Sequence, residues 1–123
     1  MAAFMMYGFV LIILRDFAPG KEAWIASYTT GAHFEARLAH VHGNLFSLIN
    51  IVLGYLLIKL PVNAKMAKWV SGLAIAGLLM PLGILGELYL KLPFYTVLVG
   101  GLSIFVATVM FGVAVVQMRA EIK

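Results

Sequence analysis

The sequence predicts an all-α integral membrane protein in which four transmembrane helices form a single domain, a bundle that assembles into an oligomer. Of its 123 residues, 63% are hydrophobic and only 11% are charged, and the mean hydropathy is +1.03. A soluble domain of this size leaves much of its surface in water and cannot hide so much apolar surface. Four long apolar segments, separated by short stretches with proline, glycine or charged residues, make up most of the chain. Such segments are expected to be helical, because a helix satisfies its own backbone hydrogen bonds inside lipid.

The first helix is expected over residues 1–17 and the second over residues 32–60. The first is about 25 Å long, which is short for a hydrocarbon core of about 30 Å. Arg15 and Asp16 mark its far end, and the proline and glycine after Ala18 stop it. The segment between these two helices is therefore expected to be the longest loop of the chain.

The third helix is expected over residues 67–90 and the fourth over residues 94–118. Pro81 is expected to kink the third helix, because proline lacks the N–H of a helical hydrogen bond. Glycines leave a smooth surface on which another helix can approach closely. The third helix carries four of them, at Gly72, Gly77, Gly83 and Gly86.

The distribution of basic residues predicts the orientation in the membrane, because cytoplasmic loops carry an excess of lysine and arginine. The side with both termini and the middle loop has Lys59, Lys65, Lys68, Arg119 and Lys123. The other side has Arg15, Lys21, Arg37 and Lys91, balanced by Asp16, Glu22, Glu35 and Glu87. This bias favours cytoplasmic termini, in a bacterial or archaeal inner membrane.

The expected second helix carries a polar arc that would be costly to expose to lipid. At about 100° per residue, the arc comprises Arg37, His40, Gly43, Asn44, Ser47, Asn50 and Gly54. His42 points nearly the opposite way, among Leu38, Leu45, Phe46, Ile49 and Leu53. A unit of four helices can hardly seal such an arc alone, so we expect the second and third helices to mediate assembly.

His40 and His42 are the candidate metal ligands, because neutral imidazole binds haem iron, copper and zinc. Their side chains diverge by about 200°, so the pair does not easily grip one metal ion. They can serve two sites, or both can be packing residues. Arg37, about one and a half turns nearer the end of the helix, is placed for a haem propionate. Gly43 removes a side chain, so that a flat macrocycle can approach the helix.

A second set of polar residues allows a different function. Asn44, Ser47, Asn50 and Glu87 can line a path for a small solute or an ion. Polar residues in membrane helices more often hydrogen-bond to a neighbouring helix, and this is the favoured interpretation of the two asparagines and Ser47. Glu87 lies about one turn from Lys91 and can form an interfacial ion pair. A structural or accessory subunit without chemistry of its own is a third possibility.

Several classes of function are excluded by the composition. The chain has no cysteine, which excludes disulfides, thiolate ligands and cysteine-linked haem. Its formal charge is +4, but the basic residues are scattered at helix ends, so nucleic acid is not an expected partner.

The segment Ala39-His-Val-His-Gly-Asn-Leu-Phe-Ser-Leu-Ile-Asn-Ile51 resembles the haem-ligating helices of the haem–copper oxidase catalytic subunit. One of those helices carries a His-x-His pair whose histidines serve the high-spin and the low-spin haem. Another carries a His-Gly pair whose histidine is the second low-spin ligand. His40 and His42 match the first pattern and His42-Gly43 matches the second, so His42 corresponds to a low-spin haem ligand in either alignment.

That catalytic subunit has twelve helices in three arcs of four, with pseudo-threefold symmetry. The resemblance implies a single-arc relative that rebuilds the ring as a homotrimer, binds b-type haem, and takes part in electron transfer or haem handling with a redox partner. The chain has no His-x-x-x-Tyr and no adjacent His-His pair, so the copper site of that family is not expected. The resemblance leaves open whether the chain catalyses a reaction.

Overall fold

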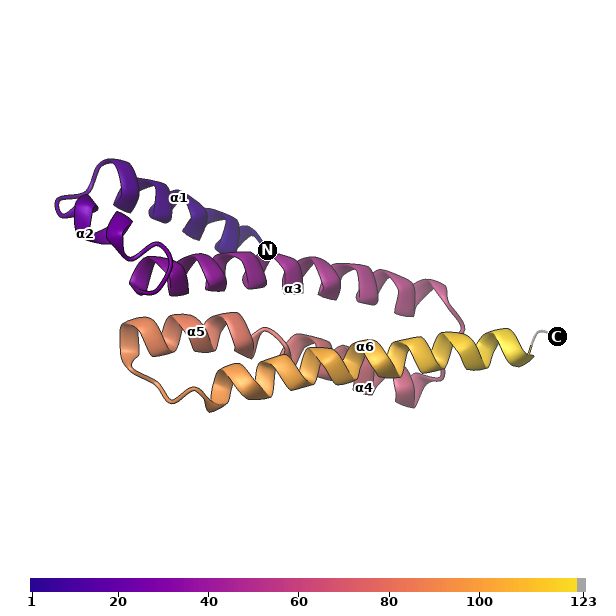
Figure 1. The fold of residues 1–123 in the computed structure, drawn as a ribbon. Helices are drawn as coiled ribbons and strands as arrows, with labels where there is room; N and C mark the ends of the chain where they lie inside the picture. Colours follow the sequence, from indigo (N-terminus) through magenta and orange to yellow (C-terminus); the bar gives the residue numbers. More distant parts are fainter. Residues whose placement is uncertain (122–123) are drawn as a thin grey trace.

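The computed structural model describes residues 1–121, with side chains through Met118, as an elongated bundle of helices (Figure 1). The helices are α1 (Ala2–Asp16), α2 (Lys21–Ala26), α3 (Ala32–Lys59), α4 (Ala64–Ala76), α5 (Leu79–Leu90) and α6 (Tyr95–Glu121). Residues 1–121 contain no strand, so the all-α expectation is confirmed.

Three helical stretches are long and apolar enough to cross a membrane. They are Ala32–Lys59, Ala64–Leu90 and Tyr95–Met118, and the second of them comprises α4 and α5. Large apolar side chains cover their outer surfaces, and Ile58 is 83% exposed. Hydrocarbon suits such a surface better than water does. The structure thus supports a multi-pass membrane protein and accounts for three of the four expected spans.

α1, expected to be the first span, is shorter than these three stretches. It has 15 residues, which corresponds to about 22 Å at 1.5 Å per residue. It lies against the N-terminal half of α3 (Figure 1), with the ring of Phe4 on Gly43. The loop expected after α1 contains the short helix α2, which begins after Gly20 in the left-handed conformation (φ 82°). Glycine adopts this φ without strain, so the chain can turn sharply there.

Just before Pro81, where a kink is expected, the stretch Ala64–Leu90 is interrupted. Pro81 has no N–H to donate to the carbonyl of Gly77, and α4 ends at Ala76 while α5 begins at Leu79. Tighter hydrogen bonds bridge the gap, from Met80 N–H to the Gly77 carbonyl at 3.1 Å and from Leu78 N–H to the Ile75 carbonyl at 3.0 Å. The stretch Ala64–Leu90 also begins earlier than the third helix was expected to begin, because the side-chain oxygen of Asn63 accepts from Lys65 N–H at 2.8 Å.

Glycines bring α6 close to the stretch Ala64–Leu90, as their spacing indicated. A Cβ on Gly77 would lie 2.7 Å from Ile104 Cβ, and one on Gly83 would lie 2.5 Å from Thr96 Oγ1. From the other side, Gly100 of α6 packs directly on the backbone of Met80. Gly86 packs on Leu92, whereas Gly72 has open space around it. Most of the predicted smooth surface is therefore used within the chain.

The closed part of the core lies where α3, α4 and α6 meet. Its buried residues are Phe46, Leu53, Val70, Ala74, Ile104 and Ala107. α5 packs along the N-terminal half of α3, and α1 covers part of another flank of the same half. α3 therefore contributes to this core and also contacts α1, α2 and α5.

Candidate functional site

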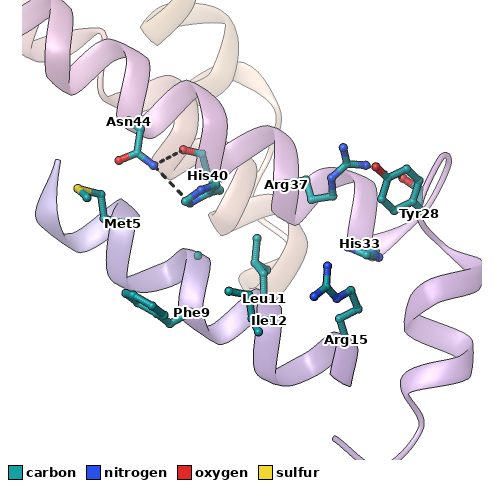
Figure 2. Close-up of a pocket in the computed structure, with 11 residues that line it drawn as sticks. Met5, Phe9, Leu11, Ile12, Arg15, Tyr28, His33, Arg37, His40 and Asn44 are labelled. Carbon is teal, nitrogen blue, oxygen red and sulfur yellow. Dashed lines mark hydrogen bonds between the residues drawn. The ribbon is translucent and has the colours of Figure 1, made fainter. Parts of the chain in front are cut away.

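Four polar residues of α3 lie on one side of the helix and face α1. Because α3 is regular from Ala32 onward, His33, Arg37, His40 and Asn44 follow one another along it (Figure 2). Together with α1 they line a groove of about 520 Å³, which we call the α1–α3 groove. Its apolar lining comes from Met5, Gly8, Phe9, Leu11 and Ile12, and Arg15 and Tyr28 complete it.

His40 is held between α1 and α3. Its Nδ1 lies 2.7 Å from the Phe4 carbonyl oxygen. A carbonyl can only accept, so Nδ1 carries the proton and Nε2 keeps the lone pair of the neutral ring. A Cβ on Gly8 would lie 2.6 Å from His40 Cε1, which shows how closely the ring approaches the α1 backbone. His40 therefore fastens α1 to α3.

His42 lies outside the groove, as the divergence of the two histidines predicts. Its Nδ1 donates to the Leu38 carbonyl oxygen at 2.9 Å. The ring is half-buried and meets Phe46 edge to face, with ring centroids 5.8 Å apart. No partner of Nε2 lies among the described residues. His42 thus offers an imidazole nitrogen with its lone pair free, in apolar surroundings.

His33 has a packing role at the start of α3. The ring is only 4% exposed, and it stacks on Trp24 with centroids 4.8 Å apart. Its Nδ1 donates to the Trp24 carbonyl oxygen at 3.1 Å, and Tyr28 meets it edge-on at 5.2 Å. These contacts hold α2 against α3.

Arg37 lies in the groove with His40 and not beside His42. Its guanidinium lies 3.8 Å from the centre of the Tyr28 ring, and Nη1 donates to the Tyr28 carbonyl at 3.4 Å. The nearby Arg15 holds the Asp16 carboxylate through Nε at 3.0 Å and Nη2 at 2.7 Å. The hydrogen bonds from Arg15 lower the pKa of Asp16 below its usual value. Arg37 forms no ion pair within the described part of the chain.

The four residues considered as a polar lining do not meet in one cavity. Asn50 donates to the Ala74 carbonyl at 2.8 Å and to the Phe46 carbonyl at 2.9 Å, so it joins α3 to α4. Asn44 donates to the His40 carbonyl at 3.0 Å, while its own Oδ1 is buried without a partner in residues 1–118. Ser47 is 6% exposed. Glu87 is exposed, and no ion pair joins it to Lys91 in the described residues.

Gly43 serves the packing of α1, because the Phe4 ring occupies the space that a side chain at this position would need. The contribution of α1 to the site was not foreseen. The available signal was the spacing of Phe4, Gly8 and Leu11, which places two bulky side chains and a gap on one face of a helix. α1 also reaches α5, where the hydroxyls of Tyr7 and Tyr89 lie 2.7 Å apart.

No group of three or more histidine, aspartate and glutamate side chains comes together in the described residues. Comparison of the chain with protein-family models, with curated proteins and with solved structures gave no match. The case for a function therefore rests on the geometry of α3 and its neighbours.

Proposed function

We propose that this chain is a membrane protein that binds b-type haem, with Nε2 of His42 as an axial ligand. The observation that carries the proposal is the hydrogen bond from His42 Nδ1 to the Leu38 carbonyl at 2.9 Å. A histidine that binds a metal commonly donates its other ring N–H to a carbonyl, which fixes both the tautomer and the direction of the ring. His33 and His40 donate from Nδ1 in the same way, but their rings are packed against Trp24 and against α1, whereas His42 lies outside the α1–α3 groove.

The surroundings of His42 suit a macrocycle. Phe46 lies beside the ring, and the neighbouring Leu45 is 47% exposed. Apolar contacts of this kind keep water from haem iron and raise its reduction potential. Leu45 is exposed in a single chain, so a second copy packed on this face would complete the apolar site.

The number of side-chain ligands that one chain offers suits haem better than copper or zinc. A protein zinc site takes three or four side-chain ligands, and the described residues gather no such group. Haem brings four ligands of its own, so one histidine from each of two chains completes the coordination of its iron. The second ligand would be a histidine of a neighbouring subunit, which links haem binding to the formation of an oligomer.

His40 and Arg37 take different roles from His42 in this proposal. His40 orients α1 through its 2.7 Å bond to the Phe4 carbonyl. Arg37 is directed to Tyr28 in the same α1–α3 groove, away from His42. We propose further that α1 enters the membrane beside α3 as the fourth helix of the bundle, and that the end of the bundle with Lys59, Lys65 and Lys68 faces the cytoplasm. Such a protein would pass electrons or haem to a partner.

An absorption spectrum of the detergent-purified protein, before and after addition of haemin, tests the proposal. The wild type is expected to show a Soret band and to bind haem with six-coordinate iron. His42→Ala is expected to lose the Soret band and to shift the oligomer toward monomer in gel filtration, because the proposed ligand bridges two chains.

His33→Ala is the matched control, since it removes an imidazole that is stacked on Trp24 at the start of the same helix. It is expected to retain haem. Full haem occupancy in His42→Ala, or no haem in the wild type after reconstitution, would show that the chain is not a haem protein of this kind.

A further inference from the structure

The α1–α3 groove has a pattern of charge that haem binding at His42 does not use. Arg15, Arg37, Tyr28 and His33 lie at one end of it, and Met5 and Asn44 lie at the other (Figure 2). The lining contains two arginines and no aspartate or glutamate. Because Arg15 is paired with Asp16 through Nε and Nη2, Arg37 supplies the positive charge at this end of the groove that is unpaired within the described residues.

The guanidinium of Arg37 keeps most of its hydrogen-bonding capacity. A guanidinium has five N–H donors in a fork that matches a carboxylate or a phosphate. Within the described residues, Arg37 donates one hydrogen bond, to the Tyr28 carbonyl at 3.4 Å. The stacking of the guanidinium on the Tyr28 ring, at 3.8 Å, fixes its plane without using these donors.

The rest of the groove is apolar and open. Met5, Phe9 and Ile12 of α1 are 52%, 66% and 44% exposed, whereas the ring of His40 fills the space beside Gly8. From Arg15 back to Met5 the helix rises about 15 Å at 1.5 Å per residue. An alkyl chain can lie along this distance with its polar end at Arg37.

We propose that the α1–α3 groove binds an anionic amphiphile. The guanidinium of Arg37 binds its acidic head group, and its alkyl chain lies along Phe9 and Ile12. Arg37 lies in the second turn of a membrane-length helix, near the level at which lipid head groups lie. A carboxylate of a free fatty acid and a phosphate of an anionic phospholipid present the same chemistry here. The proposal is independent of haem at His42.

Native mass spectrometry of the purified protein tests this and identifies the source of the anion. The protein is titrated in separate arms with palmitate, phosphatidylglycerol and phosphatidylcholine. Saturable one-to-one binding of palmitate alone assigns a free fatty acid, and binding of phosphatidylglycerol alone assigns a membrane lipid. Phosphatidylcholine, whose head group has no net charge, is expected to bind weakly.

Variants locate the bound molecule. Arg37→Gln is expected to weaken binding of the anionic amphiphile about tenfold, since it removes a charged hydrogen bond. Lys65→Gln is the matched control, because it removes the same charge from an exposed side chain at the other end of the bundle, and it is expected to leave the affinity unchanged.

A second variant covers the case in which Arg37→Gln does not fold. Ile12→Glu places a carboxylate in the groove one turn from Arg15, at a side chain that is 44% exposed, and is expected to weaken binding comparably. Equal affinity for phosphatidylcholine and the anionic probes would overturn the proposal. So would an absence of binding to any of them, or equal affinities in the groove variants and Lys65→Gln.

Discussion

α3 packs against α4 on one side and against α1 on another, and the two contacts differ in kind. On the α4 side, Val70 and Ala74 are buried beside Phe46 and Leu53 of α3, and apolar hollows lined by Gly54, Leu57 and Ser71 lie next to them. On the α1 side, the contact depends on the Phe4 ring at Gly43 and on the bond from His40 to the Phe4 carbonyl. Between these contacts and the end of α1, a groove of about 520 Å³ stays open.

The difference follows from the side chains available to each contact. Alanine, valine and glycine allow helix backbones to approach, because they carry little volume and no polar group. Arginine and histidine need partners for their nitrogens, so they keep neighbouring helices apart unless a carbonyl or an anion lies within reach. The α1–α3 contact is therefore the open and polar one, and the α3–α4 contact is the more apolar one, with hollows beside it.

The largest effect is expected where α6 packs on α5, away from both contacts of α3. A methyl group at Gly100 would collide with the backbone of Met80, so Gly100→Ala should lower the free energy of unfolding by about 1–3 kcal/mol. Gly112→Ala is the control in the same helix, where nothing lies within 4 Å, and it should leave stability unchanged or raise it by up to about 1 kcal/mol. Unfolding in mixed micelles measures both, and equal values would contradict the close packing of α5 on α6.

An intermediate effect is expected where Asn50 joins α3 to α4. Asn50→Ala leaves the Ala74 carbonyl without its 2.8 Å side-chain donor, next to the break at Gly77. The expected loss is about 0.5–2 kcal/mol. Ser103→Ala removes a hydroxyl that bonds only to Val99 of its own helix, and it should cost clearly less. A loss no larger than that of Ser103→Ala would show that Asn50 does not join the helices.

The smallest effect on global stability is expected at the open contact. Gly8→Ala places a Cβ 2.6 Å from the ring of His40, so α1 should loosen while the three long stretches stay folded. Hydrogen exchange of the α1 amides should become faster, with little change in the unfolding midpoint. Gly54→Ala, where nothing lies within 4 Å, is the control in α3. A global loss as large as that of Asn50→Ala would remove the distinction between the two contacts.

Much of the fold could be predicted because it depends on local sequence. Lipid requires each span to satisfy its own backbone, so hydropathy alone indicated the three long stretches. Pro81 indicated the break because proline removes one helical hydrogen bond in any context. α1 was harder to interpret, since 15 apolar residues suit either a short span or a helix packed on a neighbour.

The sequence by itself determined that α3 has a polar arc and that His40 and His42 point in different directions, because the periodicity of a helix decides both. Only the tertiary structure decided which histidine is held by α1 and which lies outside the α1–α3 groove. The bonds responsible join residues far apart in the chain, His40 to Phe4 across 36 positions and Asn50 to Ala74 across 24. Helix periodicity gives the side of a helix on which a residue lies, but it does not give the neighbour on that side.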